Sequence, residues 1–400
     1  MTATTTRDQT QVFVVREYQR VTVPCSNELA AKMHAEGHVR VSPSPIAGHH
    51  DVTTRQKVGV LRYGSLELRI VPKVPVSRLL YLSTFLKDDD SWHQIETMLD
   101  DVDDSFSAIA HALAFYSERA LRPTPLQGYV THEQAEMQVR GRLLFDRQLS
   151  SRAGIPLPAE LRYDEYELGI AENRVLKAAL LVVARFVRNP LVAARLRHQL
   201  AQLDGVEPWM IGQPVPEFSF GRMNERYRGA LALAKVVLEG RSLEYSRARK
   251  VGTAFLFNMN TVFETYLESS LRLAFGKHGG RVEGQHKTWL DIDDSVLMRP
   301  DVTWWRNGRC AAVIDAKYKR AKSENYPNAD AYQMFAYCTR LGLRRGYLVY
   351  ADLDGKDAGR SVIRNSGIEI VVTSLDIGGT IPELTASVED LATEIASTTA

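Results

Sequence analysis

The stretch "AAVIDAK" at residues 311–317 places two charged residues directly after an unbroken apolar run. Such a run is typical of a strand that is buried on both faces, as the central strands of a parallel sheet are. Burying a charge without a partner is costly, so Asp315 and Lys317 require polar neighbours. Because side chains two positions apart point to the same face of a strand, we expect these two to lie together. The sequence therefore predicts a buried strand that ends in a charged site.

The preceding stretch, "MRPDVTWWRNG" at residues 298–308, contributes a second aspartate, Asp301. Its Asn-Gly dipeptide is typical of a two-residue hairpin turn that leads into the next strand. In a regular hairpin Asp301 would lie opposite Ile314, and Asp315 would face the other side of the sheet. A bulge or a three-residue loop would instead bring Asp301 opposite Asp315. We predict that such an offset exists, since a regular hairpin would separate the two carboxylates.

This combination of residues suits the hydrolysis of a phosphodiester. Mg²⁺ prefers carboxylate oxygens and usually takes only one or two from the protein, which Asp301 and Asp315 could supply. Glu264, on the preceding predicted helix, could contribute a further carboxylate. Lys317 could orient the attacking water or stabilise the developing negative charge. An isolated acid–x–lysine pair is more often only an exposed strand end, so the buried apolar run before it is what favours a site.

Two polar residues, Gln333 and Tyr337, lie one turn apart in the predicted helix "NADAYQMFAYCTRLGL". Both could reach a phosphate or hold the lysine in place, although an ordinary polar helix face is the alternative interpretation. The ordered series of Glu264, Pro300-Asp301, Asp315-x-Lys317 and Gln333-x-x-x-Tyr337 resembles the PD-(D/E)xK nuclease motif in its RecB-like branch. This resemblance implies a restriction-endonuclease-like α/β domain that cuts DNA, with these residues at its catalytic site.

The length of 400 residues indicates two or three domains, since one domain usually has roughly 150 residues. We predict an α+β protein in three parts: a β-rich N-terminal domain at 1–90, a mainly helical middle region at 91–250, and an α/β domain at 251–400. The stretch "TAFLFNMNTVFETYLESSLRLAF" is interpreted as the first helix of the last part, and the tail after about 375 carries no motif. The four main helices expected in the middle are "SFSAIAHALAFYSERAL", "AENRVLKAALLVVARFV", "LVAARLRHQLAQL" and "YRGALALAKVVLEG", with a β-like insertion around "EMQVRGRLLF" and a loop at "AGIPLPAEL".

The composition is that of an ordinary globular protein, and its net charge of +2 neither requires nor excludes a nucleic-acid partner. No run approaches the roughly 18 apolar residues that span a membrane, and the start "MTATTTRDQT" lacks the apolar core of a secretion signal. Three widely spaced cysteines without a CxxC motif are typical of reduced thiols. We therefore expect a cytoplasmic protein that has no contact with a membrane.

Basic residues gather in the last part of the sequence, and as a group they suit contacts with DNA phosphates. For any single one of them, an ordinary solvated surface is the simpler interpretation. The group comprises "RARK" at 247–250, then Arg306, Arg309, Lys317, Lys319, Arg320, Lys322, Arg340, Arg344 and Arg345.

Four further stretches make the resemblance more specific. They are "VGVLRYGSLELRIVPKV", "VRGRLLF", "YDEYELGIAENRVLKAAL" and "FLFNMNTVFETYLESSL", and they occur in the order found in the McrC family. McrC proteins are the nuclease subunits of McrBC-type restriction systems, and generic RecB-like nucleases lack the first three stretches. The resemblance covers most of residues 11–375. Pro72-Lys73, at the end of the first stretch, is a recurring feature of the family, where it is expected to end a strand.

The resemblance implies a Mg²⁺-dependent DNA endonuclease subunit of a GTP-driven complex that restricts DNA carrying 5-methylcytosine-type modifications, as in defence against foreign DNA. In that family the N-terminal region docks onto a ring of McrB, an AAA+ GTPase, and stimulates it. Double-stranded DNA is the implied substrate, with Asp301, Asp315 and Glu264 as metal ligands. The sequence contains no GxxxxGK[ST] motif, so any chemistry on GTP must come from such a partner.

Two alternatives remain open at the level of the sequence. The chain could be a stand-alone RecB-like DNA nuclease that needs neither GTP nor a partner. It could also be a non-catalytic activator of the GTPase motor, whose nuclease fold serves only as a DNA clamp. The intact set of acidic residues and Lys317 argues against the second alternative, because a clamp has no need of them.

Overall fold

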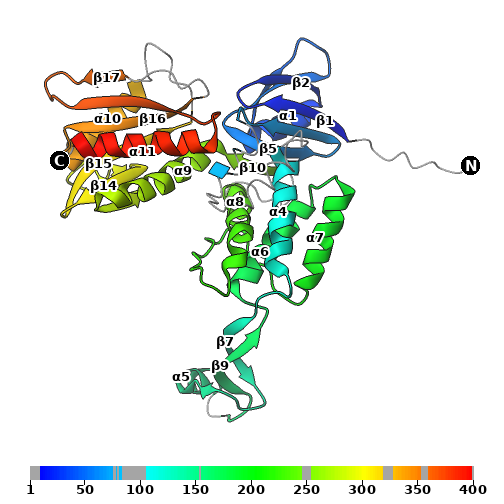
Figure 1. Cartoon of the computed structure of the whole chain (residues 1–400). Helices are drawn as coiled ribbons and strands as arrows, with labels where there is room; N and C mark the ends of the chain where they lie inside the picture. Colours follow the sequence, from blue (N-terminus) through cyan, green and yellow to red (C-terminus); the bar gives the residue numbers. More distant parts are fainter. Residues whose placement is uncertain are drawn as a thin grey trace, which may run out of the picture. The chain divides into compact units, whose positions relative to one another are not determined.

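The computed structural model describes residues 10–74, 78, 81–82, 105–152, 155–245, 254–318, 328–352 and 359–398. The chain divides into two compact units, Met1–Ser105 with Thr253–Ala400 as the first and Phe106–Gly252 as the second. Both units combine helices and strands (Figure 1), so the predicted α+β class is confirmed. The division into three domains stays a prediction. Of the predicted basic group, residues 247–250, Lys319, Arg320 and Lys322 lie outside the described residues.

The N-terminal part of the first unit contains a four-stranded sheet in the order β1-β6-β5-β10. β5 (Lys57–Tyr63) and β6 (Leu66–Val71) form a hairpin, and its turn contains Gly64 at a φ of +60°. β1 (Gln11–Arg16) runs parallel to β6 along one edge, and β10 (Ala254–Asn258) pairs antiparallel with β5 along the other. The fourth strand of the N-terminal sheet therefore comes from the part of the chain that follows the second unit in the sequence.

The prediction of one long helix at 253–275 was wrong at its beginning. Residues Ala254–Asn258 form the strand β10, and the helix α9 (Met259–Phe275) starts only after it. An apolar run of four or five residues has no periodicity that would separate a buried strand from a buried helix turn. Pairing with β5 decides the matter, and it requires Gly59, because a Cβ atom there would collide with the carbonyl oxygen of Phe255.

A second, three-stranded sheet in the N-terminal part has the order β2-β4-β3. Its strands are β2 (Arg20–Pro24), β3 (Arg40–Pro43) and β4 (His49–Thr53). Helix α1 (Asn27–Glu36) follows β2 and is capped by Ser26, whose hydroxyl accepts a hydrogen bond from the Leu29 amide at 3.2 Å.

The second unit contains the four helices expected from their apolar periodicity and a three-stranded sheet in the order β7-β9-β8. The β-like insertion predicted around 136–145 was too short. The loop predicted at 153–161 was wrong at its C-terminal end, because β9 begins at Ala159. Long polar strands with few apolar residues give a weak signal in the sequence. The elements are α4 (Ser105–Leu121), β7 (Gly128–Glu136), β8 (Arg142–Leu143), α5 (Phe145–Arg152), β9 (Ala159–Glu167), α6 (Ala171–Ala184), α7 (Pro190–Gln202), η1 (Glu225–Tyr227) and α8 (Arg228–Tyr245).

The C-terminal part of the first unit is built on a six-stranded sheet in the order β11-β14-β15-β16-β18-β17. β15, β16 and β18 are parallel to one another at its centre, and the other pairs are antiparallel. The tail without a motif forms a helix, α11. The elements after α9 are η2 (Gly276–His278), β11 (Arg281–Gly284), β12 (Thr288–Trp289), β13 (Leu297–Met298), β14 (Val302–Arg306), β15 (Arg309–Lys317), α10 (Asn328–Leu341), β16 (Arg345–Asp352), β17 (Gly359–Val362), β18 (Glu369–Asp376) and α11 (Ile381–Thr398).

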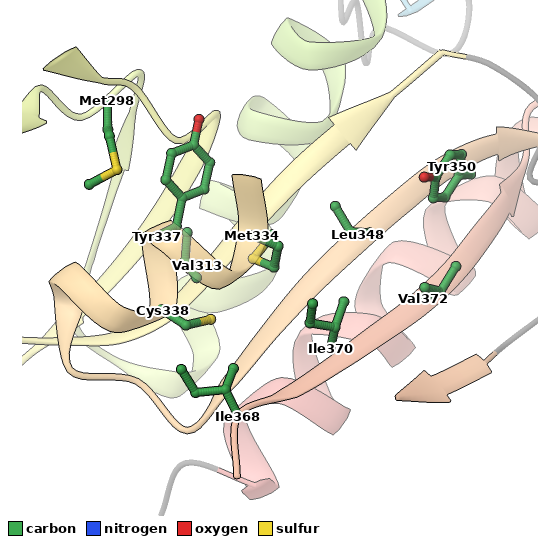
Figure 2. Packing of buried hydrophobic residues seen from close by; sticks show 10 residues of the cluster. All are labelled: Met298, Val313, Met334, Tyr337, Cys338, Leu348, Tyr350, Ile368, Ile370 and Val372. Carbon is green, nitrogen blue, oxygen red and sulfur yellow. The ribbon is translucent and has the colours of Figure 1, made fainter. Parts of the chain in front are cut away.

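Helix α10 packs on this sheet through a core of buried apolar side chains. Figure 2 shows Met334, Tyr337 and Cys338 of the helix against Val313, Leu348 and other side chains of the strands. Complete burial of a side chain such as Leu348 contributes about 2 kcal/mol. This packing fixes the helix that carries Gln333 and Tyr337 over the strands that carry Asp315 and Lys317.

Gly346 permits the close approach of α10 to β16. A Cβ atom at this position would collide with Met334 Sδ and lie 2.6 Å from Cys338 Sγ. We expect Gly346→Ala to lower the free energy of unfolding by about 1–3 kcal/mol, the usual cost of overpacking a core. Urea unfolding measures this, with Gly359→Ala as the control, since the Cβ position of Gly359 has no atom within 4 Å. Equal effects of the two changes would contradict the role of Gly346.

Candidate active site

The hairpin of β14 and β15 contains the predicted offset. Its turn residues Asn307 and Gly308 have φ angles of +49° and +76°, as a two-residue primed turn requires. The register then shifts between Trp304 and Trp305, because β15 contains one extra residue there. Val302 consequently pairs with Ile314, whereas in a hairpin without the extra residue it would pair with Val313. Continued by one residue, this register brings Asp301 beside Asp315, and the prediction of an offset is confirmed.

Asp301 is held by two hydrogen bonds. Its Oδ2 accepts from the backbone amide of Ala316 at 2.9 Å, and its Oδ1 accepts from Gln285 Nε2 at 2.8 Å. Asp315 lies deeper and is only 1% exposed. Its Oδ2 accepts no hydrogen bond of regular geometry among the described residues, but it forms a close ion pair with Lys317 Nζ. The two carboxylates therefore share the end of one strand pair.

Lys317 connects the carboxylates to helix α10. Its Nζ donates a hydrogen bond to Gln333 Oε1 at 3.0 Å, and Gln333 Nε2 donates to the Tyr337 hydroxyl at 2.7 Å. That hydroxyl in turn donates to the Arg299 carbonyl oxygen at 3.3 Å, next to Pro300-Asp301. The predicted site residues Asp301, Asp315, Lys317, Gln333 and Tyr337 thus form one continuous polar chain.

Glu264 approaches the same place from α9. It is half-buried, and its charge interacts with those of Asp315 and Lys317. It follows Phe263, a fully buried residue on the apolar face of the helix that was predicted from the sequence. Helix periodicity therefore places Glu264 at the border between the core and the site.

The crowding of carboxylates changes their acidity. Burial, and then the charge of Asp301, raise the pKa of Asp315 to about 7, against the opposing effect of Lys317. Burial and the charge of Glu264 raise the pKa of Asp301, while burial and the charge of Asp315 raise that of Glu264. Burial lowers the pKa of Lys317, but the adjacent Asp315 outweighs burial and the net shift is upward. Lys317 therefore remains charged, and the site carries an excess of negative charge that a cation would relieve.

The donor set suits a hard divalent cation. Mg²⁺ typically binds one or two carboxylates and completes its shell with water and substrate phosphate, and Asp301 and Asp315 match that requirement. Within the described ranges, no group of three or more His, Cys, Asp or Glu side chains is placed to hold a metal ion. Glu264 as a third ligand thus stays a prediction, and the aspartate pair is the part of the site that fits a metal.

Two described members of the predicted basic group lie away from this site. Arg306 and Arg309 flank the hairpin turn, at the opposite end of β14 and β15 from Asp301 and Lys317. Arg345 begins β16, three residues before Leu348, which pairs with Asp315, and it forms an ion pair with Glu369. Only the pairing of the strands reveals this separation, because in the sequence Arg306 and Arg309 lie between Asp301 and Asp315.

Two polar residues beside the site were missed by the sequence analysis. Gln285, which donates to Asp301, lies in an irregular segment after β11 and carries no pattern that would single it out. Asp330, in the first turn of α10, is 5% exposed, and its Oδ2 accepts from the Tyr350 hydroxyl at 2.6 Å. The charge of Asp330 also raises the pKa of Lys317. Its position three residues before Gln333, on the same helix face, was the available signal.

The model of the family described as "McrBC 5-methylcytosine restriction system component" matches residues 52–351, well over half of the chain. The chain belongs to this family. The membership in the McrBC family that the sequence predicted is therefore confirmed. Among curated proteins, the comparison finds no match.

Two solved structures of the McrBC family from Thermococcus gammatolerans resemble this chain. One is a refined half-complex from a tetradecameric assembly of McrB AAA+ hexamers with bound McrC, and the matched chain is 17% identical with a TM-score of 0.54. That match covers 95% of this chain and 100% of the other. The second is a McrBC complex, 18% identical with a TM-score of 0.42, covering 66% of this chain and 88% of the other. At this identity the first match shows a shared fold over nearly the whole length.

One further property concerns membranes. No helix in the part of the chain that the structure describes combines the length and the apolarity needed to cross a bilayer.

The raised pKa of Asp315 predicts a pH-dependent gain of stability in Asp315→Asn. Between the pKa values of about 4 and about 7, Asp315 keeps its proton only in the folded chain, so the wild type loses stability as the pH rises through this range. Without divalent metal, we therefore expect the variant's advantage in the free energy of unfolding to grow from pH about 4 to about 7. Urea unfolding in chelator measures it, with Asp293→Asn as an exposed control. A difference that does not vary with pH would contradict the prediction.

Proposed function

We propose that this chain is the Mg²⁺-dependent DNA endonuclease subunit of a GTP-driven complex that restricts DNA with 5-methylcytosine-type modifications. The observation that carries the proposal is the register shift in the β14–β15 hairpin, which brings Asp301 beside Asp315 with Lys317 on the same strand. A buried strand has no structural need for two repelling carboxylates. Membership in the McrBC restriction family adds the biological context.

The order of elements supports a PD-(D/E)xK type of nuclease domain. Helix α9 with Glu264 is followed by the antiparallel hairpin with Asp301, Asp315 and Lys317, and then by α10 with Gln333 and Tyr337. α10 leads into β16, which lies parallel to β15. Each motif of the sequence resemblance thus falls on an element of the corresponding kind.

The residues of the chain divide the work of hydrolysis. Bound Mg²⁺ would supply an activated water and a positive charge at the scissile phosphate. Asp301 and Asp315 would hold the ion, with Glu264 as a possible further carboxylate. Lys317 stays protonated beside Asp315, so it can orient the attacking water or neutralise charge that develops on the phosphate. Gln333 fixes the Lys317 ammonium, and Tyr337 fixes Gln333.

A GTPase partner is part of the proposal. One of the similar solved structures contains McrC bound to McrB AAA+ hexamers, and we propose an equivalent McrB-like ring for this chain. The absence of a GxxxxGK[ST] motif from the sequence supports this division of labour. The motor subunit would select the modified base, and both subunits would act on double-stranded DNA. The complex would work in the cytoplasm.

Two surfaces are candidates for docking the ring. The N-terminal region, expected from the family, exposes Val14, which is 60% exposed on β1. The small sheet of the second unit, with α5, exposes more apolar surface, and Figure 1 shows it extending beyond the helices of that unit. Exposed apolar side chains gathered on one small sheet and its helix are typical of a protein interface. Its exposed side chains are Tyr129, Met137, Val139, Phe145, Leu149, Ile155, Leu157 and Tyr166.

The first test is cleavage of methylated plasmid DNA with Mg²⁺ by the wild type and by Asp315→Asn. Each is assayed alone and with the partner GTPase, with and without GTP. We expect cutting to require partner and GTP and to fall by at least about a thousandfold in the variant, because a metal ligand is lost. GTP hydrolysis should be stimulated equally by both proteins, and Asp293→Asn should cut like the wild type.

The same assay separates the alternatives. Cutting by the wild type without GTP and partner would support a stand-alone nuclease. Undiminished cutting by the complex with Asp315→Asn would show that the hairpin is not the site, and would support an activator or clamp.

The docking surfaces are tested by charge substitutions. We expect Phe145→Asp or Val14→Asp, whichever lies in the interface, to lower the stimulation of GTP hydrolysis by at least about tenfold, because a charge is buried there without a partner. Ile292→Asp serves as the control, since Ile292 is fully exposed on the β12–β13 connection. If neither variant differs from the control, both surfaces are excluded as the docking site.

A further inference from the structure

Glu17 is a buried carboxylate that lies outside the candidate active site. It directly follows β1 and is 1% exposed. Its backbone amide extends the pairing with β6 by donating to the Val71 carbonyl oxygen at 3.0 Å. Its Oε1 accepts two hydrogen bonds, from the Lys73 amide at 2.8 Å and from the Tyr318 hydroxyl at 2.7 Å. Glu17 therefore joins the N-terminal sheet to a residue 301 positions away in sequence.

Tyr318 is the residue immediately after Lys317. It is 6% exposed, and its ring packs against that of Phe263 with centroids 6.4 Å apart. Phe263 immediately precedes Glu264 on α9. Tyr318 is thus connected to two residues of the candidate site. It follows Lys317 directly in the sequence, and it packs on Phe263, which directly precedes Glu264. A hydrogen bond that fixes the Tyr318 ring also restricts the backbone that aims Lys317.

The N-terminal sheet holds the other side of the site as well. β10 is its fourth strand and runs directly into α9, where the Met259 amide donates to the Gln56 carbonyl oxygen at 3.0 Å. The helix with Glu264 and the strand end with Lys317 are consequently both attached to this sheet, the first by chain continuity and the second by the Glu17–Tyr318 hydrogen bond.

Stability alone is a poor explanation for Glu17. A buried carboxylate carries a desolvation cost, and apolar residues of similar size often replace such groups without loss. The second oxygen of Glu17, Oε2, accepts no hydrogen bond from the residues that the structure describes. Its retention at the end of a strand is understandable if the direction of its hydrogen bond to Tyr318 matters.

We infer that Glu17 and Tyr318 are positioning residues, whose hydrogen bond fixes the end of β15 so that Lys317 stays directed at Asp315 and Gln333. The inference rests on the proposed nuclease function and extends it to the N-terminal part of the chain. In the part of the chain that the structure describes, neither residue forms a hydrogen bond with Asp301, Asp315 or Glu264, so their role is positioning and not catalysis. Pro72-Lys73 gains a role as well, because the Lys73 amide orients the Glu17 carboxylate.

The test uses the full chain with the partner GTPase, GTP, Mg²⁺ and methylated plasmid DNA. Tyr318→Phe removes only the hydroxyl. We expect kcat for cleavage to fall by at least about tenfold, since small misplacements of a catalytic group have large effects on rate. KM for DNA, the stimulation of GTP hydrolysis and the thermal unfolding midpoint should match those of the control.

The matched control is Tyr63→Phe. Tyr63 is 2% exposed in the same N-terminal sheet, and its hydroxyl donates to Glu36 Oε2 at 2.7 Å, the same distance as in the Glu17–Tyr318 pair. Tyr63→Phe removes a tyrosine–glutamate hydrogen bond that joins β5 to α1. A purely structural role would give both variants the same loss of cleavage in proportion to their loss of stability.

Variants at Glu17 complete the design. Glu17→Gln keeps an accepting oxygen and should retain most of the cleavage rate, while Glu17→Leu removes it and should lose as much as Tyr318→Phe. The double variant should lose no more than either single change, because both disrupt one contact. Cleavage by Tyr318→Phe at the wild-type rate, or additive losses in the double variant, would overturn the positioning role and leave the nuclease proposal standing. A wild type that fails to cut in the complete assay would refute the nuclease proposal, and the inference with it.

Discussion

The candidate site depends on one extra residue in a hairpin. Without the bulge in β15, a two-residue turn would pair Asp301 with Ile314 and direct Asp315 to the opposite face. With it, the two carboxylates meet, the Ala316 amide reaches Asp301, and Lys317 lies beside Asp315. This register places the charged end of β15 where helix α10 brings Gln333 to Lys317.

Bringing these groups together has an energetic cost that the surrounding fold must offset. Three carboxyl groups raise one another's pKa, and among the described residues Lys317 is the one lysine beside them. The apolar packing of α10 on β15, β16 and β18 supplies the opposing stabilisation, and it also determines where Gln333 meets Lys317. A site with a net excess of negative charge is suited to a cation.

The sheet of the N-terminal part is the second support of the site. It receives β10 as its edge strand and passes the chain on to α9, and Glu17 at the end of β1 reaches Tyr318 behind Lys317. Regions that are far apart in the sequence thereby hold the geometry of the candidate site. Under the proposed function, contacts made by the N-terminal part could affect the strand that carries Lys317.

The sequence by itself determined the elements with strong periodicity, the Asn-Gly hairpin, the need for an offset in it, and the set of residues that resembles the McrBC family. It could do so because helix and strand periods, turn residues and buried charges act locally. Only the tertiary structure decided that residues 254–258 pair as a strand, that β9 begins in a presumed loop, and that Arg306 and Arg309 lie at the far end of the hairpin from the carboxylates. It alone revealed Gln285, Asp330 and the Glu17–Tyr318 contact. Those features depend on long-range pairing, where one partner lies tens or hundreds of residues away and leaves no periodic signal in the chain.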